Sequence, residues 1–493
     1  MKRKISVFMV LIIVLSLISS CKTEELISVS QYKQNTEIKE EIKLSLENVK
    51  SFNPYKETNP ANLQIFGLIY EPLFTYDEKM RTVPLLVQSY EVSDGGKKIT
   101  VSLKDNVIWH NGDELSSNDV IYTINLILSS DSLYSKGIIE RAEVIDKKTV
   151  AITFIKPQMN APEKLMFPII KSDDLAGTGP FKFVGKESTD TYAFSRFEKY
   201  HGEKGKTQSV KMINCPDAEA IERLFDIGET DILTSYAFDY AAFNVSDDIK
   251  MYDYPTNELL YIGVNFDNSV FWGENTRQAL LYIPDKKEIA EKVMYKKVLR
   301  ADFPINPESF LYPKEIECQK DNEYAEELLL KDSWTRVDGV FSRIIDESLQ
   351  KFKINMLVKD SEEMKMISSA IEKSFDNFGI ECDVVIKPEA EFNESIKNKE
   401  YDIFIDRVTL SGSADFESLT GEGNIFGYLN SDLAQLTEKI RTQKDEEKLR
   451  LLYIECCSVL LKDVQFIPLF FYKDAVLTRN YISEDIVLKL TAS

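Results

Sequence analysis

The stretch from residue 107 to residue 124 contains the side-chain types that a nucleophilic hydrolase uses. His110, Asp113, Ser116 and Ser117 lie within eight residues of one another. In a catalytic triad, the histidine takes the serine proton and the carboxylate orients the histidine. The members of a triad usually come from separate loops, so one short stretch that holds all three types is a weak signal for catalysis.

The same stretch has a simpler interpretation as a strand, a turn and the start of a helix. Asn111-Gly112 is a tight-turn dipeptide that follows an apolar run. Ser116 and Asp119 fit a capping box, in which the hydroxyl accepts from the N–H three residues on and the carboxylate accepts from the cap N–H. The helix that follows is expected to have an apolar face made of Val120, Ile121, Ile124, Ile127 and Leu128. We therefore expect no catalytic residues here, with an exported hydrolase as the alternative.

The N-terminus has the pattern of an export signal. Basic residues 2–4 precede a run of about fourteen mostly apolar residues, which is shorter than the roughly 20 residues that span a bilayer. Cys21 follows in a Leu-x-Ser-Cys context that resembles a bacterial lipoprotein box. We predict a signal peptide over residues 1–20, lipidation of Cys21 and a tether over residues 21–40. The protein would then be extracytoplasmic and anchored to the cell membrane through its lipid.

Composition limits the classes of partner and cofactor. The formal net charge is −21, which disfavours nucleic acid as a partner. Besides Cys21 there are five cysteines, an odd number that cannot form a complete disulfide framework, and we expect most of them to be small buried hydrophobic residues. Two histidines and no Cys-x-x-Cys motif leave little material for a metal site. No cofactor is predicted.

The order of elements predicts an α/β protein with two lobes. Strand patterns dominate the first half of the mature chain. In the second half, a strand over residues 353–358, a helix over 361–378 and a strand over 382–386 form a βαβ unit with a parallel strand pair. A length of 493 residues suits two or three domains, and ligands commonly bind in clefts between domains.

Eight short motifs, in order along the chain, resemble those of the family 5 extracellular solute-binding proteins, the oligopeptide- and dipeptide-binding receptors of ABC importers. The resemblance extends from about Ile42 to Leu477. The motifs are Phe52-Asn53-Pro54-Tyr55, Ile69-Tyr70-Glu71-Pro72-Leu73, Ser89 to Gly96, Val107 to Ile124, Gly177-Thr178-Gly179-Pro180-Phe181, Gly228 to Ile232, Asn275 to Leu280 and Ile467-Pro468-Leu469.

The resemblance implies a two-lobed periplasmic-binding-protein-like fold with a hinge and a cleft, plus a peripheral β-rich domain. It implies hinge crossings near Tyr261–Asn265 and Ile467–Tyr472, and it makes the Trp-His-x-Gly stretch a scaffold feature. The expected divisions are lobe 1 over residues 41–68, 175–260 and 468–493, the peripheral domain over 69–174, and lobe 2 over 261–467.

The resemblance also implies a ligand site. Ala414-Asp415-Phe416 matches the motif whose aspartate holds the α-ammonium of a bound peptide. A buried ammonium is costly without a counter-charge, so this carboxylate would favour ligands with a free N-terminus. Further candidates are Tyr472 at the return hinge, Arg407, and the cleft-lining segment of Leu233, Thr234 and Ser235. Each of these residues also has a plain structural interpretation, as a loop, cap or packing residue.

The expected function is capture of a small ligand, most readily a peptide, by lobe closure and its delivery to the permease subunits of an ABC importer. The protein would be a monomer and not an enzyme. The segment from Ser411 to Asn430 lacks the tryptophan and the Asp/Glu-Pro pair that often accompany the aspartate. This departure leaves open a nickel chelate, a sugar or an opine as the ligand, or a sensing or adhesion lipoprotein that is no longer coupled to transport.

Overall fold

The computed structural model describes residues 39–129, 137–171, 175–234, 247–345 and 347–491. The predicted signal peptide, Cys21, nearly all of the predicted tether and Ser235 lie outside these ranges. Within the described ranges, no helix combines the length and the apolar character needed to cross a membrane.

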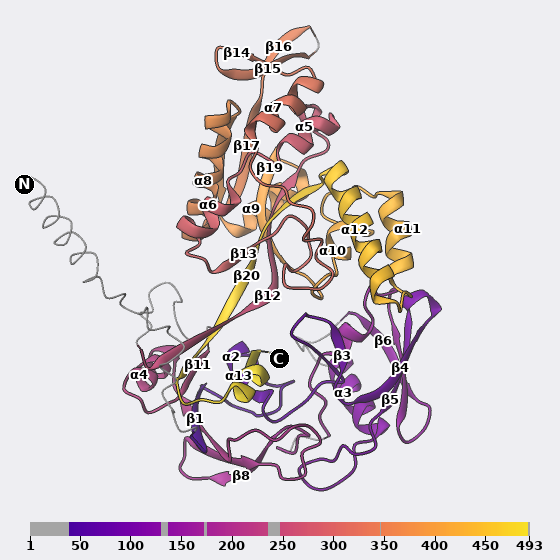
Figure 1. Cartoon of the computed structure of the whole chain (residues 1–493), viewed down its shortest axis with the longest axis vertical. Helices are drawn as coiled ribbons and strands as arrows, with labels where there is room; N and C mark the ends of the chain where they lie inside the picture. The colour runs from indigo at the N-terminus through magenta and orange to yellow at the C-terminus, as the bar shows by residue number, and fades with distance from the viewer. Residues whose placement is uncertain (1–38, 130–136, 172–174, 235–246, 346, 492–493) are drawn as a thin grey trace, which may run out of the picture.

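One large sheet runs through the whole molecule (Figure 1). Its main path has the order β18-β17-β19-β12-β20-β11-β1-β10-β9-β8, and β13 pairs with β20 beside that path. The eleven strands are β1 (Glu41–Glu47), β8 (Phe181–Lys186), β9 (Thr191–Arg196), β10 (Ser209–Cys215), β11 (Ile232–Thr234), β12 (Ile249–Val264), β13 (Val298–Arg300), β17 (Lys353–Lys359), β18 (Glu381–Lys387), β19 (Ile403–Thr409) and β20 (Phe466–Arg479).

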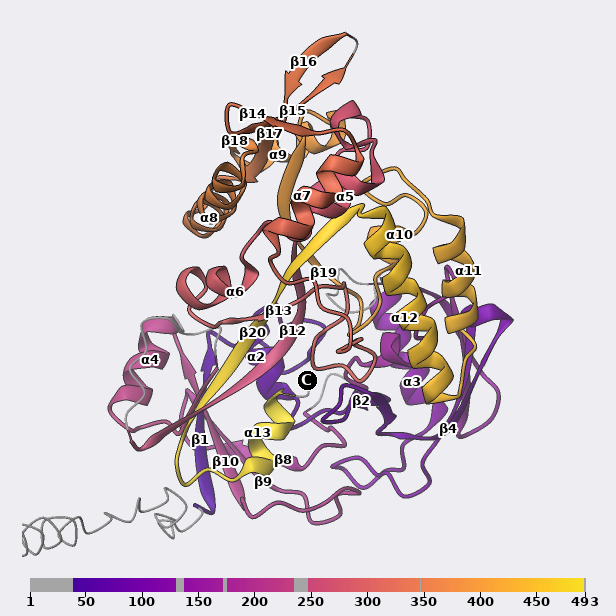
Figure 2. The ribbon, with the colours of Figure 1, turned by 45° about the horizontal axis from the view of Figure 1, so that its top comes forward.

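Strands β12 and β20 join the two ends of this sheet. They pair antiparallel from Ile249↔Arg479 to Gly263↔Phe466 and pass side by side between the upper and lower parts of the molecule (Figures 1 and 2). The pairing of β12 with β20 shifts between Pro255 and Leu259 and again between Leu260 and Tyr261, beside the expected crossing near Tyr261, whereas β12 pairs regularly with β19 from Glu258 to Val264. An interrupted ladder is where a paired strand bends most easily, and the hinge near Tyr261 stays a prediction.

The upper part contains the predicted βαβ unit. Strands β17 and β18 are parallel, with Ile354 opposite Cys382, and α8 (Glu362–Phe378) connects them. The Ser361 side chain caps α8 by accepting the N–H of Met364, and Gly379 ends it in the left-handed conformation at φ 95°. The sequence prediction of this unit is confirmed, including both ends of its helix.

Other helices cover the upper part of the sheet, and a small antiparallel sheet of order β14-β15-β16 stands at its far end (Figure 1). The helices are α5 (Glu274–Ala279), α6 (Lys286–Glu288), α7 (Asn322–Lys331), α9 (Glu389–Asn398), α10 (Glu417–Thr420), α11 (Ser431–Ile440) and α12 (Glu446–Asp463), and the small sheet consists of β14 (Thr335–Val337), β15 (Val340–Ile345) and β16 (Ser348–Lys351).

The lower part holds a second, four-stranded sheet of order β4-β5-β7-β6 beside the ends of the large one. Side chains of the two sheets share one hydrophobic core, which includes Leu44, Val101 and Val210. The remaining elements are β2 (Phe74–Tyr76), β3 (Thr82–Pro84), β4 (Val87–Ser93), β5 (Lys98–Leu103), β6 (Ile139–Val144), β7 (Thr149–Phe154), α2 (Pro60–Phe66), α3 (Ser117–Ser129), α4 (Ala218–Asp226) and α13 (Glu484–Thr491).

Two of the sequence motifs meet in the lower part around His110. Its ring accepts the N–H of Gly177 on Nδ1 at 3.1 Å, so Nε2 carries the hydrogen that it donates to the carbonyl of Gly179 at 2.9 Å. A Cβ on Gly177 would lie 1.8 Å from the carbonyl oxygen of Ile69, which explains the glycine. Burial lowers the pKa of His110, as this neutral tautomer requires.

The predicted capping box at the start of α3 is half confirmed. Asp119 accepts the N–H of Ser116 at 2.8 Å, as predicted. The Ser116 hydroxyl does not take the N–H of residue 119 but donates to the Asp119 carboxylate at 2.8 Å, because an ionised carboxylate is the stronger acceptor. On the expected apolar face, Val120, Ile124 and Ile127 are buried, whereas Leu128 is exposed.

The five described cysteines, Cys215, Cys318, Cys382, Cys456 and Cys457, are all buried and free. They act as small apolar residues, as predicted, and burial raises the pKa of each thiol.

Candidate functional site

The serine, histidine and aspartate residues between His110 and Ser117 are not arranged as a catalytic triad. His110 is bound to the two glycines described above. Ser116 donates to Asp119, Ser117 donates to the carbonyl of Asp146, and Asp113 pairs with Lys171. In this arrangement no serine hydroxyl is bound to the imidazole, which a triad requires.

Asp415 lies in the loop between β19 and α10, and its side chain is 4% exposed. Its Oδ2 accepts the hydroxyl of Ser411 at 2.9 Å, and its Oδ1 accepts the N–H of Glu417 at 3.2 Å. A lysine of the lower part completes this set, since Lys164 Nζ donates to the same Oδ2. The carboxylate predicted to hold a ligand ammonium is therefore already paired with a cation of the chain itself.

Lys164 comes from the 3₁₀ turn Pro162–Leu165, 251 residues before Asp415. Its side chain is 1% exposed. Besides Asp415, its ammonium donates to the carbonyl and to the hydroxyl of Ser411, both at 2.7 Å. An ammonium has three hydrogens to donate, and here they have three acceptors within one short loop.

Glu163, the neighbour of Lys164, makes a second contact with the same loop. Its Oε1 accepts the hydroxyl of Tyr76 and the N–H of Ser413, the latter at 2.8 Å. We call Tyr76, Glu163, Lys164, Ser411, Ser413 and Asp415 the Asp415 cluster. Burial raises the pKa of Glu163, and the attraction of Lys164 only partly offsets the rise. For Asp415, burial also raises the pKa, but the charge and hydrogen bond of Lys164 outweigh it and the pKa is lowered.

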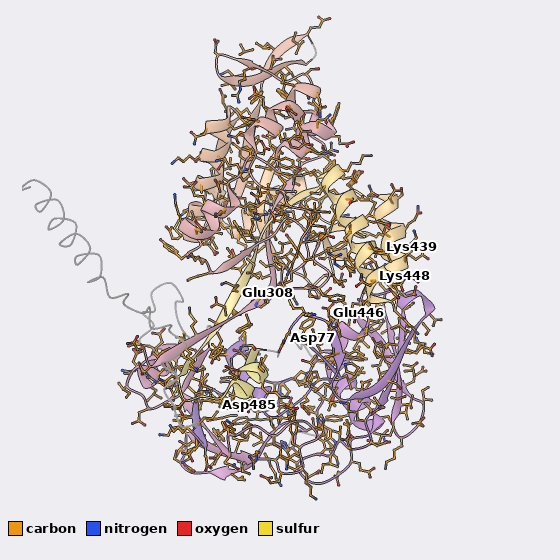
Figure 3. All side chains as sticks on the ribbon, in the orientation of Figure 1. Asp77, Glu308, Lys439, Glu446, Lys448 and Asp485 are labelled. Atoms are coloured by element: carbon orange, nitrogen blue, oxygen red, sulfur yellow. The ribbon has the colours of Figure 1, made fainter. Side chains whose placement is uncertain are left out.

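Further contacts surround the cluster where the upper and lower parts meet. The N–H of Phe310 donates to the carbonyl of Lys79 at 3.0 Å. Arg81 pairs with Asp77 at 2.7 Å and reaches Glu446 at 3.5 Å, and Figure 3 shows Asp77 and Glu446 near each other at the lower end of α12. The Asp415 cluster is therefore the buried centre of a larger contact with an exposed rim.

Arg407 and Tyr472 lie together elsewhere. The guanidinium of Arg407 is 5.4 Å from the centre of the Tyr472 ring. It is also 3.5 Å from Glu258 and 3.6 Å from Glu363, and it is 43% exposed. Burial raises the pKa of Tyr472, and the neighbouring Glu363 raises it further. This group sits where β19 and β20 flank the irregular part of β12.

Leu233 and Thr234 belong to β11, whose backbone pairs with β20. Both side chains are buried, and Leu233 packs with Phe225 and Leu477. The predicted site residues therefore fall into three separate places, and the described partners of Asp415 include none of the others. Their predicted roles in ligand binding stay predictions.

Sequence reasoning missed Glu163 and Lys164. They follow Pro162 in a short 3₁₀ turn that has no sequence motif. Charged residues are almost never fully buried unless they are paired, so their sequence did not indicate burial. Their partners are about 250 residues away, so no local pattern in a single sequence could have identified them.

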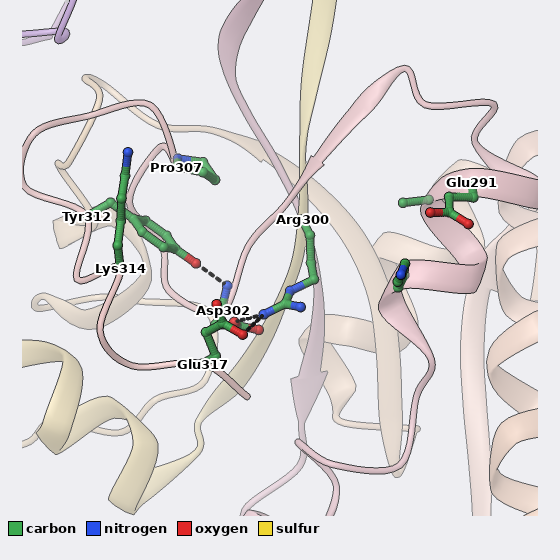
Figure 4. Close-up of a pocket in the computed structure, with 9 residues that line it drawn as sticks. Glu291, Arg300, Asp302, Pro307, Tyr312, Lys314 and Glu317 are labelled. Atoms are coloured by element: carbon green, nitrogen blue, oxygen red, sulfur yellow. Dashed lines mark hydrogen bonds and ion pairs between the residues drawn. The ribbon is translucent and has the colours of Figure 1, made fainter. Parts of the chain in front are cut away.

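A hollow of about 480 Å³ opens in the upper part, lined by Arg300, Asp302, Tyr312 and Glu317 among others (Figure 4). Some of its charged groups pair with each other or with a neighbour. Asp302 accepts from Arg300 at 2.7 Å and from Lys286 at 2.9 Å. No residue predicted to bind ligand lines this hollow.

Comparison with known proteins gives consistent results along almost the entire chain. The family described as bacterial extracellular solute-binding proteins, family 5 Middle, matches residues 81–421. The oligopeptide-binding protein AppA of Bacillus subtilis is 23% identical over 456 residues, covering 85% of this chain and 84% of AppA. The dipeptide-binding protein DppE of the same organism is 23% identical, covering 88% of this chain and 86% of DppE.

Among solved structures, a nickel ABC transporter protein from Bacillus halodurans has a TM-score of 0.75 at 18% identity, covering 90% of this chain and 95% of that one. At that identity the likeness concerns the fold. Since the family match covers more than half of the sequence, this chain belongs to the bacterial extracellular solute-binding proteins of family 5, a family of binding proteins that work outside the cytoplasm.

Proposed function

We propose that this protein captures a peptide outside the cytoplasm and delivers it to the permease subunits of an ABC importer. The observation that carries the proposal is the match to oligopeptide- and dipeptide-binding relatives over more than four fifths of the length of each chain. The nickel-transporter structure shares the fold at 18% identity, which does not favour a nickel chelate over a peptide.

The architecture supports capture by hinge motion. Among the residues that the structure describes, only β12 and β20 of the large sheet continue from its upper strands to its lower strands, and their pairing is interrupted between Pro255 and Leu259 and again at Leu260/Tyr261. A ligand closes such a molecule only if it contacts both parts when they are closed and one part when they are open. Arg407 and Tyr472 flank this interruption, so we propose that they contact the ligand from the upper part, with residues 233–235 contributing from the lower part.

The ligand itself provides the test. The untagged full-length protein is purified from its native host, denatured, and the released small molecules are identified by mass spectrometry. We expect peptides. The most abundant one, resynthesised and added in saturating amount to refolded ligand-free protein, should reduce the radius of gyration in small-angle X-ray scattering. Release of a metal chelate or a sugar without peptides would contradict the proposed ligand, and an unchanged radius would argue against closure.

We also propose that a lipid on Cys21 anchors a monomeric protein to the cell membrane. The support is the Leu-x-Ser-Cys context after a short apolar run. Cys21→Ser should abolish metabolic palmitate labelling and move the protein out of the membrane fraction. A variant that is still labelled and membrane-bound would refute the anchor.

A further inference from the structure

We infer that Lys164 is the cation of Asp415 whenever the upper and lower parts are closed on each other, so that this receptor does not select peptides by a free N-terminal amine. The inference rests on the proposed peptide ligand and specifies which peptides the site accepts. Lys164 then takes the position opposite Asp415 that the family resemblance assigned to the α-ammonium of the ligand.

The chain itself supplies most of the hydrogen bonds of the pair. Both oxygens of Asp415 accept from the chain, and Oδ2 accepts from both Lys164 and Ser411. The Ser411 hydroxyl accepts from Lys164 and donates to Asp415, so its role in each bond is consistent. A carboxylate has about four acceptor positions, so a ligand ammonium that took the place of Lys164 on Oδ2 would have to break existing bonds.

A Lys164 displaced from Asp415 would lie in a buried place. Its side chain is 1% exposed, and its neighbours Ala161 and Leu165 belong to the hydrophobic core of the lower part. If a ligand took Asp415, closure of the two parts would leave this ammonium without its counter-charge, which is costly. Exchange of one ammonium for another gains nothing that offsets this cost, so the pair of Lys164 and Asp415 forms again when the parts close around the ligand.

The pair of Lys164 and Asp415 belongs to a larger contact. Glu163 holds the N–H of Ser413 beside it, and the N–H of Asn306 donates to the Ser413 carbonyl at 2.7 Å from the other side. Moving Lys164 away from Asp415 would disturb the neighbouring bonds of the same loop. The chain thus supplies the cation that pairs with Asp415, and the ligand does not need to provide it.

A competition experiment tests the inference. An equimolar synthetic hexapeptide library, half with free and half with N-acetylated termini, is equilibrated with the full-length protein, and bound members are counted by mass spectrometry. We expect the parent to bind both forms within about twofold. Lys164→Met should favour free amines by about tenfold or more, since the ligand ammonium then supplies the missing cation. The double variant K164M/D415N should lose that preference.

Lys147→Met, which removes an exposed lysine of the same part of the chain, serves as the matched control and should behave like the parent. A parent that favours free amines by tenfold or more would overturn the inference, and so would a Lys164→Met variant without preference. If the parent binds neither form, the proposed peptide ligand is contradicted, and the inference falls with it. Failure of the two proposals is thus distinguishable.

A labelling measurement covers the case in which Lys164→Met does not fold. The full-length parent is treated with acetic anhydride, with and without the peptide library, and the modification of each lysine is followed by mass spectrometry. In the sample with peptides, where the two parts are closed, Lys164 should react at least about tenfold more slowly than Lys147, because it is buried and paired. Reaction of Lys164 at the rate of Lys147 in that sample would show displacement and overturn the inference.

Discussion

The imidazole Nε2 of His201 lies 2.7 Å from a carboxylate oxygen of Glu71, deep in the lower part of the molecule. The same oxygen accepts the hydroxyl of Thr178 at 3.1 Å. The other oxygen accepts the hydroxyl of Tyr200 at 2.6 Å and lies 3.5 Å from the ammonium of Lys489 in α13. Glu71 therefore joins the Ile69–Leu73 motif to the Gly177–Phe181 motif and to the C-terminal helix. The presence of Glu71 in the Ile69–Leu73 motif therefore reflects a structural role.

Replacement of this carboxylate should cost stability. Glu71→Gln keeps the shape of the side chain but removes the charge that His201, Tyr200 and Lys489 face. Because hydrogen bonds to buried charged groups contribute about 1.5–3 kcal/mol each, we expect the free energy of unfolding in urea to fall by about 2–3 kcal/mol. Glu114→Gln, at an exposed pair with Lys147, should change it little. Equal losses in the two variants would contradict this assignment.

The same carboxylate should make stability depend on pH. Burial alone raises the pKa of Glu71, but the hydrogen bond from His201 and the charge of Lys489 bring it below its ordinary value of 4.5. The folded state then binds this proton less tightly than the unfolded chain. The stabilisation is present above pH 4.5 and is lost as the pH falls toward the lowered pKa.

The contribution of Glu71 to this pH dependence is obtained by comparing the parent with Glu71→Gln. Unfolding of the parent and of Glu71→Gln is measured in urea between pH 7 and pH 3. The gap between their free energies of unfolding should narrow as the pH falls below 4.5. Parallel profiles over this range would show that Glu71 does not titrate differently in the folded state. Asp415 and Glu163 are present in both proteins, so their own titrations cancel.

Local patterns predicted the local structure well. Ser361 and Gly379 mark both ends of α8, and the flanking strands are parallel, because caps and hydrophobic periodicity depend on neighbours in sequence. The continuity of the large sheet through β12 and β20 was not predicted. A strand pattern shows which face is buried but not which distant strand pairs with it.

The candidate site was predicted less well for the same reason. Asp415 was identified from its motif, but its partner Lys164 is 251 residues away and belongs to a turn without any signature. Sequence gave no sign that the chain itself supplies the cation. Arg407 and Tyr472 were named separately, and the structure brings them into contact through adjacent strands.

The start of α3 gives a prediction that separates scaffold from site. Asp119 accepts the N–H and the hydroxyl of Ser116 and, at 3.3 Å, the indole N–H of Trp109. Ser116→Ala removes one of these bonds and should cost about 1 kcal/mol of unfolding free energy, whereas Asp119→Ala removes the acceptor of all three donors, including the buried indole N–H, and should cost about 2–3 kcal/mol. Peptide affinity, measured by calorimetry with the co-purified peptide, should be unchanged in both. Lost affinity with unchanged stability would make this stretch part of the site.

The buried pair of Lys164 and Asp415 should dominate the stability of the contact between the upper and lower parts. Asp415→Ala leaves an ammonium that is 1% exposed without its counter-charge, and breaking a buried pair in this way typically costs about 3–5 kcal/mol. Asp415→Ala combined with Lys164→Met removes both charges, so the second substitution should recover part of the loss. We expect urea unfolding of the two single variants and the double variant to show this non-additivity.

Lys147→Met should change stability little, because its pair with Glu114 is exposed. Strictly additive losses would mean that the two side chains do not depend on each other, and the pairing inferred for Lys164 would lose its energetic basis.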